Sequence, residues 1–218
     1  MENGGQLIDR AEPAVLPPTL RAGLALVAVV AALVVVAVGS WYAGHGRPGA
    51  VDAWIQPAVD DAGAPCRRIA LAIDFLGEPI GAAVLVGAAV VGCLLLRSPR
   101  AAVQFVGGAG VAVGATKLLK PLVGRTIHGD NLSYPSGHTA FLTAFALTAA
   151  LLAAGRIGLG PRAGALLVLA AALVAGAAMG WAQVALGAHY PTDVLGGWCT
   201  ALAVVPATGW LVDRWKAG

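Results

Sequence analysis

Two histidines and an aspartate stand at the ends of apolar segments in the second half of the chain. His189 is followed four residues later by Asp193, and His138 lies well upstream. A carboxylate that accepts a hydrogen bond from one imidazole nitrogen fixes the tautomer and leaves the other nitrogen free to attack an electrophile. The spacing of His189 and Asp193 favours this pairing on one face of a helical turn, although Pro191 between them leaves the local geometry open. The alternative is an interfacial histidine and aspartate that are simply solvated.

His138 belongs to the run YPSGHT at residues 134–139. Pro135 ends any preceding helix and Ser136 is a favourable N-cap, so a helix is expected to begin here. Helix N-termini bind phosphate through free backbone N–H groups and the positive end of the helix dipole. Gly137 lets a ligand approach the backbone closely, and His138 occupies the first turn. An ordinary helix start with an interfacial histidine is the alternative.

Three cations precede this run, at the end of another apolar segment: Lys117, Lys120 and Arg125. Each one taken alone is explained by a basic side chain that extends toward lipid headgroups. Together with the two histidines, they would form a cationic pocket for a phosphate group that carries several negative charges.

The composition indicates where this chemistry takes place. Of the 218 residues, 58% are hydrophobic and 11% are charged, and the mean hydropathy is +0.79, whereas soluble domains carry about 25% charged residues. Unbroken apolar runs rich in Ala, Val, Leu and Gly indicate membrane-spanning helices and not a β-barrel. The net charge of +3, with scattered basic residues, gives no support for a nucleic-acid partner. The three cysteines lack metal-ligand spacing, so we interpret them as buried thiols.

The sequence therefore predicts an all-α fold, a polytopic membrane helix bundle with about six transmembrane helices. The spans are expected at residues 20–39, 79–96, 101–119, 139–154, 163–186 and 194–212. Residues 1–19 are expected to form a cytoplasmic N-terminal tail, and residues 20–213 to form the membrane domain. Within that domain, residues 43–78 are expected to form an outer loop with short interfacial helices between the first and second spans.

The distribution of Lys and Arg predicts the orientation of the chain. With the N-terminus in the cytoplasm, eight basic residues fall on the inner side and six on the outer side. Three of those six are Lys117, Lys120 and Arg125, whose position is explained by the expected cationic pocket. Without them, the count is eight on the inner side against three on the outer side. Six spans then place residues 117–138 and His189 on the same outer face, where they can meet.

The motifs, in this order, resemble the three-part signature of the type 2 phosphatidic acid phosphatase superfamily, the membrane lipid phosphate phosphatases. That signature reads roughly K-x6-R-P, then P-S-G-H, then S-R-x5-H-x3-D. Residues 135–138 match the middle part fully, and residues 189–193 match the H-x3-D of the last part. The resemblance covers about residues 116–197 and extends to the six-span layout.

The resemblance implies a mechanism that uses no metal and no cofactor. His189 would be the nucleophile and form a phosphohistidine, with Asp193 orienting it and stabilising its charge. His138 would protonate the leaving lipid oxygen and later activate water. The phosphate oxygens would be held by Ser136, the Gly137 amide and Lys120.

Two arginines of the family signature are missing. Ile127 occupies the position of the phosphate-binding arginine, and Gln183 replaces the arginine that precedes the last histidine. Arg125 is expected to substitute for one of them, with help from Lys117 or His128, and Gln183 retains hydrogen-bond donors. Alternatively, the pocket binds a less charged group or turnover is weak.

We therefore expect an integral membrane phosphatase that acts on a lipid phosphate, a polyprenyl diphosphate or a polyprenyl phospho-sugar at the outer face of the cell membrane. Phosphatidylglycerol phosphate and phosphatidate are further candidates, and the high alanine and glycine content favours bacterial envelope lipids. The alternative is a catalytically weak or inactive protein that binds lipid phosphates on the same scaffold. A transporter is disfavoured because no ionisable residue falls at the centre of a predicted span. The spans also disfavour a haloperoxidase, a related soluble enzyme class with similar motifs.

Overall fold

The computed structural model describes residues 14–60 and 64–215. In chain order its elements are η1 (Pro18–Leu20), α1 (Arg21–Trp41), α2 (Ala50–Asp60), α3 (Ala64–Phe75), α4 (Pro79–Leu95), α5 (Pro99–Val123), β1 (Thr126–Ile127), β2 (Asn131–Leu132), α6 (Gly137–Ile157), α7 (Pro161–Ala185) and α8 (Pro191–Arg214). The predicted helical membrane bundle is confirmed. The short antiparallel pair of β1 and β2 is an addition that the sequence did not predict.

Proline and glycine mark many of the helix ends. α4, α5, α7 and α8 carry proline in their first turn, where its missing N–H has no helical partner to lose. Glycine in the left-handed region ends α5 at Gly124 and α6 at Gly158, because residues with a Cβ adopt that conformation at a cost. These signals are local in the sequence, which explains why the predicted spans agree with the helices to within a few residues.

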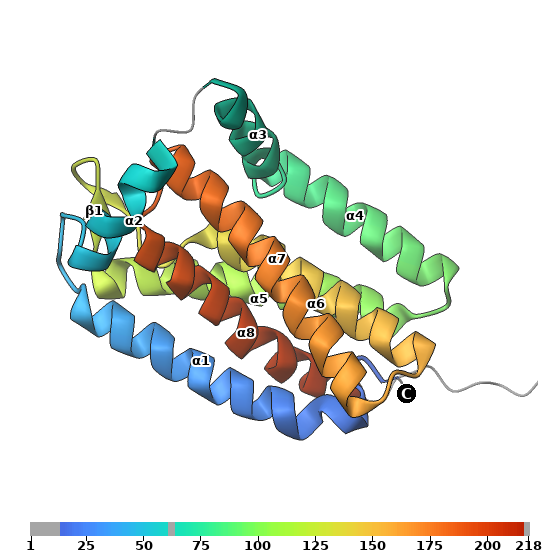
Figure 1. Cartoon of the computed structure of the whole chain (residues 1–218). Helices are drawn as coiled ribbons and strands as arrows, with labels where there is room; N and C mark the ends of the chain where they lie inside the picture. Colours follow the sequence, from blue (N-terminus) through green and yellow to red (C-terminus); the bar gives the residue numbers. More distant parts are fainter. Residues whose placement is uncertain (1–13, 61–63, 216–218) are drawn as a thin grey trace, which may run out of the picture.

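α8 packs against α1, α5 and α6, while α6 also packs along α7 and α4 lies against α5 (Figure 1). The shared core takes apolar side chains from five helices, including Leu24, Ala112, Leu147, Val168 and Leu202. Small residues permit close approach within it: a Cβ at Gly176 of α7 would lie 2.2 Å from Cδ1 of Trp198 on α8. The bundle therefore holds the ends of α5, α6, α7 and α8 in a defined arrangement.

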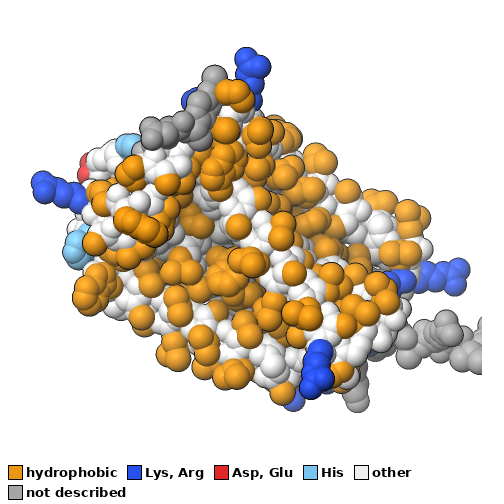
Figure 2. All heavy atoms as spheres, viewed as in Figure 1, with side chains coloured by type: hydrophobic (Ala, Val, Ile, Leu, Met, Phe, Trp, Pro, Cys, Tyr) orange, Lys and Arg blue, Asp and Glu red, His pale blue; other side chains and the backbone are white. Residues whose placement is uncertain are grey.

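Five described helices are long and apolar enough to cross a membrane: α1 extended by η1, α5, α6, α7 and α8. α4 has 17 residues and qualifies only together with α3, as a pair bent by 57° between Pro65–Phe75 and Pro79–Leu95. Apolar side chains cover the face seen in Figure 2, and most of the basic ones project at its edges. The chain is thus a multi-pass membrane protein in which the second predicted span is short and continues through a bend.

Two predicted segments outside the spans can be compared with the structure. The predicted helices within residues 43–78 are present as α2 and α3, and their position at a membrane interface stays a prediction. The predicted tail lies outside the described residues up to residue 13. Beyond it, Val15 and Leu16 are buried, and their N–H groups donate to the Asp213 carboxylate at 2.7 and 3.1 Å. The last part of the predicted tail is therefore packed against α8.

Candidate active site

One cavity of about 690 Å³ gathers most of the residues that the sequence singled out. Its walls come from the α3–α4 turn, the second half of α5, the start of α6 and the turn between α7 and α8. The lining residues with polar or reactive groups are Asp74, Glu78, Thr116, Lys117, Lys120, Gly137, His138, Gln183 and His189. The two histidine motifs thus meet at one end of the bundle, as predicted.

His189 lies in the turn between α7 and α8. The Gln183 carbonyl at the end of α7 accepts a hydrogen bond from the His189 N–H at 3.3 Å, and the His189 side chain is 9% exposed. Burial lowers the pKa of His189 below its usual value near 6.5, and the Asp193 carboxylate opposes this shift. The imidazole is therefore neutral at neutral pH, which is the form that can attack phosphorus.

Asp193 lies behind His189, in the first turn of α8. Its Oδ2 is 3.6 Å from Nδ1 of His189 and accepts a hydrogen bond from the Tyr190 N–H at 3.0 Å. This hydrogen bond is part of the capping box that begins α8, so local helix geometry holds the carboxylate. Pro191 at the first helical position is compatible with this start. With Nδ1 on the carboxylate side, Nε2 is the ring nitrogen left for the cavity.

His138 occupies the first turn of α6. Its Nε2 lies 3.7 Å from Oδ1 of Asp74 and 3.6 Å from Oε1 of Glu78. The turn between α3 and α4 packs directly on the ring, because a Cβ at Gly77 would come 2.3 Å from Cδ2 of His138. Sequence reasoning missed both acids as site residues. Both acids lie within residues 43–78, but their spacing does not indicate a site. Their contact with His138 depends on how that segment folds back onto α6.

Ser136 is the N-cap of α6, as predicted. Its Oγ accepts hydrogen bonds from Oγ1 and the N–H of Thr139 at 3.0 and 3.4 Å. Ser136 is fully buried and its own N–H donates to the Asp193 carbonyl at 2.9 Å. A Cβ at Gly197 would lie 2.2 Å from the Ser136 carbonyl oxygen, so glycine on α8 is what allows this close approach. Ser136 thus supports the helix start, while Gly137 is exposed to the cavity.

Lys117 and Lys120 supply the cationic side of the cavity from α5. Nζ of Lys120 donates a hydrogen bond to the Leu132 carbonyl at 2.8 Å. Gln183, which replaces a family arginine, is 1% exposed and donates from Nε2 to Oδ1 of Asp74 at 2.5 Å. The cavity therefore presents two lysines and two carboxylates, and Gln183 is engaged by one of those carboxylates.

Arg125 lies away from the cavity and is fully buried. It forms salt bridges of 2.6 Å with both Asp52 and Asp193. Its guanidinium carbon also lies over the rings of Tyr42 and Tyr190, at 4.1 and 4.4 Å from their centroids. Because these donors face buried carboxylates, the geometry favours support of Asp193 by Arg125 over the predicted contact with phosphate.

Asp74, Glu78 and His138 also have the composition of a cation site. Their ligand atoms all lie within 4.8 Å of one another, and carboxylate and imidazole ligands suit Zn²⁺ and similar ions. The Glu78 side chain is 51% exposed, and exposed acidic groups are common without an ion. Metal dependence is therefore a variable that an activity assay has to control.

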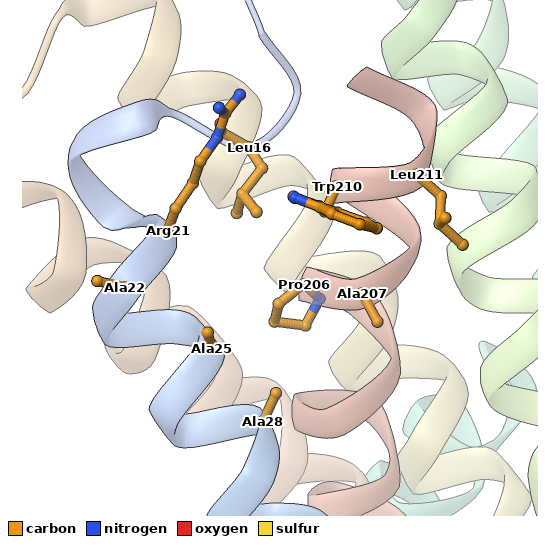
Figure 3. Close-up of a pocket in the computed structure, with 9 residues that line it drawn as sticks. All are labelled: Leu16, Arg21, Ala22, Ala25, Ala28, Pro206, Ala207, Trp210 and Leu211. Carbon is orange, nitrogen blue, oxygen red and sulfur yellow. The ribbon is translucent and has the colours of Figure 1, made fainter. Parts of the chain in front are cut away.

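A second hollow of about 550 Å³ lies between α1 and α8 (Figure 3). Its lining is mainly apolar, with Arg21 near one end, and includes Ala22, Ala25, Pro206 and Trp210. Its described lining residues include no histidine, cysteine or carboxylate, so this groove offers no nucleophile and no acid. The histidine cavity is the candidate active site.

The histidine cavity has the groups that phosphoryl transfer requires. These are a buried neutral imidazole backed by a carboxylate, a second imidazole, two lysines and the N-terminus of a helix. In such an arrangement, the cations can neutralise phosphate oxygens, one histidine can attack phosphorus and the other can exchange a proton with the leaving oxygen.

Comparisons with known proteins agree with a membrane phosphatase fold. Residues 20–217 match the family model of the PAP2 superfamily. Among solved structures, the chain is similar to a transmembrane PAP2 type phosphatidylglycerolphosphate phosphatase from Bacillus subtilis, with a TM-score of 0.69 and 21% identity, covering 87% of this chain and 98% of that one. No curated protein sequence matches the chain significantly. Because the family match spans nearly the whole chain, it confirms the resemblance that the motifs indicated: this chain belongs to the PAP2 superfamily.

Proposed function

We propose that this protein is a metal-independent phosphatase that removes phosphate from a lipid phosphate, or from a polyprenyl diphosphate or phospho-sugar, at the outer face of the cell membrane. The observation that supports it most directly is the shared cavity of His138 and His189, with Asp193 3.6 Å behind His189. A histidine in the turn before α8, the carboxylate in the first turn of α8 and a second histidine at the start of α6 provide a nucleophile, its orienting group and an acid.

The reaction proceeds in two steps. Nε2 of His189 attacks phosphorus, the bond from phosphorus to the lipid oxygen breaks, and His138 gives its proton to that oxygen. A phosphohistidine remains, and Asp193 stabilises the positive charge that develops on the ring. His138 then takes a proton from water as the water attacks phosphorus. The bond between phosphorus and Nε2 of His189 breaks, which releases inorganic phosphate and restores both histidines.

The phosphate oxygens are held by the groups that face the cavity. Lys117 and Lys120 neutralise their charge, the Gly137 amide donates a hydrogen bond, and Gln183 donates one in exchange for its contact with Asp74. Ser136 acts through the helix start that it caps. We assign Arg125 to Asp193 and not to phosphate, because both of its salt bridges are to buried carboxylates.

A lipid substrate suits the rest of the cavity lining, which includes Pro79, Ala82, Val113 and Phe141. These apolar residues lie beside the polar groups, so an acyl or prenyl chain can remain in an apolar environment while its phosphate reaches the histidines. Phosphatidylglycerol phosphate, the substrate that the name of the similar Bacillus subtilis protein gives, is one candidate. Phosphatidate and polyprenyl diphosphates are the others.

The test is phosphate release by the purified protein in detergent from a panel of these lipids, with and without EDTA. His189→Ala should abolish release and also the acid-labile phosphoenzyme that is trapped during turnover. His45→Ala is the matched control, because His45 is exposed and lies outside the lining of the cavity. Equal release by the parent and His189→Ala, or loss of release in EDTA, would contradict the proposed mechanism.

The alternative is a lipid-phosphate-binding protein with weak or no turnover. The observation that favours it is the charge of the cavity, where Asp74 and Glu78 face the two lysines and Gln183 stands in place of an arginine. Lipid binding without phosphate release from any member of the panel would support this alternative.

The proposed outer-face orientation has its own test. Phosphate release is measured with sealed right-side-out and inverted vesicles, with lipid added outside.

A further inference from the structure

Asp52 joins the short helix α2 to the start of α8. The residue is fully buried. Its Oδ1 accepts a hydrogen bond from the Thr192 N–H at 2.9 Å, and its Oδ2 accepts from Oγ1 of Thr192 at 3.1 Å and from the Gly49 N–H at 3.0 Å. Thr192 immediately precedes Asp193 in the chain. Asp52 therefore fixes the backbone that carries the carboxylate behind His189.

Arg125 connects the two carboxylates. Nη2 of Arg125 lies 2.6 Å from Oδ2 of Asp52, and Nη1 lies 2.6 Å from Oδ1 of Asp193 and 2.6 Å from Oγ1 of Thr192. All three charged side chains are 0% exposed. This is a buried chain of alternating charges that ends 3.6 Å from Nδ1 of His189.

The net charge of the buried Asp52–Arg125–Asp193 group determines the electrostatic potential at His189. One guanidinium between two carboxylates leaves one uncompensated negative charge in a buried environment, where charge interactions are stronger than in water. Asp52 neutralises Arg125, so the charge of Asp193 is not cancelled and remains available to the imidazole. If Asp52 were neutral, Arg125 would instead cancel the charge of Asp193.

We propose that Asp52 is a positioning residue for the nucleophile, because it neutralises Arg125 and thereby keeps the Asp193 charge directed at His189. The inference rests on the proposed function insofar as His189 is the nucleophile. It assigns a role in the reaction to α2, a helix that the three motifs do not include.

The kinetic test uses two variants that each remove one charge, Asp52→Asn and Arg125→Gln, and their combination. Asp52→Asn is expected to lower kcat about 10–100-fold, with KM within roughly 3-fold, because the positive charge that forms on His189 loses its stabilisation. The double variant Asp52→Asn/Arg125→Gln removes both charges and again leaves Asp193 as the one negative group. Its kcat is expected to exceed that of Asp52→Asn by at least about 5-fold. If Asp52 had a purely structural role, the double variant would have a lower kcat than either single variant.

A titration by NMR provides a readout that does not require turnover. Protein labelled at histidine is titrated in detergent, and the His189 signals are assigned with His189→Ala. Asp52→Asn should move the pKa of His189 further down, because Arg125 then offsets the carboxylate that raises it. Arg125→Gln should move this pKa up, because two carboxylates then act on the ring. The other charged and titratable groups that share the cavity with His189 are unchanged in these variants: Asp74, Glu78, Lys117, Lys120 and His138.

The control is Asp213→Asn, which removes a carboxylate with an arginine partner at the opposite end of the same helix. It should leave kcat and the pKa of His189 unchanged. The inference is overturned if Asp52→Asn keeps parental kcat and the parental His189 pKa, or if the two single variants shift that pKa in the same direction. A parent protein that releases no phosphate refutes the proposed function alone, because the opposite pKa shifts still test the role of Asp52.

Discussion

Each end of α8 carries an aspartate that pairs with an arginine from another part of the chain, and the surroundings of the two pairs differ. At the N-terminal end, Asp193 and its partner Arg125 are fully buried and only 2.6 Å apart. At the C-terminal end, Asp213 is 3.2 Å from Arg21, whose side chain is 42% exposed. Asp213 also accepts the N–H groups at the start of the described chain, whereas Asp193 faces a histidine.

The comparison shows that the same ion pair can have different effects, depending on its burial and on the groups around it. Asp193 benefits from the positive end of the α8 dipole and has a second carboxylate, Asp52, to balance its arginine. Asp213 stands at the unfavourable negative end, where backbone N–H groups and Arg21 compensate it. Asp193 at one end faces His189 in the candidate active site, and Asp213 at the other end attaches the N-terminal segment to the bundle.

The largest expected contrast concerns activity. Asp193→Asn should lower kcat about 1,000-fold, because the imidazole loses the acceptor that fixes its tautomer and stabilises its charge. Asp213→Asn should keep the parental kcat, since its carboxylate lies at the opposite end of α8. Initial rates of phosphate release at saturating lipid measure both. Equal losses in the two variants would mean that the ends do not differ in function.

The second contrast concerns stability. Arg125→Ala leaves two buried carboxylates without a positively charged partner and should destabilise the protein by about 3–5 kcal/mol. Arg21→Ala removes a partly exposed pair and should cost no more than about 1 kcal/mol. Unfolding midpoints in mixed detergent micelles compare the two variants. A larger loss for Arg21→Ala would show that the buried pair is not the stronger one.

The third prediction uses pH. Since burial lowers the pKa of His189 below 6.5, kcat/KM should fall as pH drops through that lowered value, where the nucleophile becomes protonated. Because the lowered pKa belongs to the folded state, the unfolded state binds this proton more readily. The contribution of His189 to the free energy of unfolding is therefore present above about pH 6.5 and is lost as pH falls. Rates and unfolding midpoints between pH 4.5 and 8 test both effects. Asp213→Asn should follow the parental rate profile, and an acid limb above pH 6.5 would contradict the assignment.

The smallest expected effect lies in the cavity. Asp74→Asn should lower KM roughly 3-fold, because a carboxylate beside the lysines repels the phosphate and its partial exposure weakens that repulsion. Glu78→Gln, at a more exposed position, should change KM less. Substrate titrations measure both. A higher KM for Asp74→Asn would show that this carboxylate binds the substrate or an ion that accompanies it.

Much of the fold was predictable because its signals are local. Unbroken apolar runs indicated the spans, and Ser136 was recognised as the N-cap of α6. The histidines and Asp193 were found from their order in the chain. The bend between α3 and α4 was not predicted, because a run of apolar residues does not report the angle between two helices.

The sequence by itself determined that this protein is a helical membrane protein with a histidine pair and an aspartate in the order of the PAP2 signature. Only the tertiary structure decided what Arg125 contacts. Its partners, Asp52 and Asp193, lie 73 and 68 residues away along the chain, and no spacing rule connects them. Helix ends depend on neighbouring residues, whereas a buried ion pair depends on the packing of α2 against α8, which brings distant charges together where water cannot separate them.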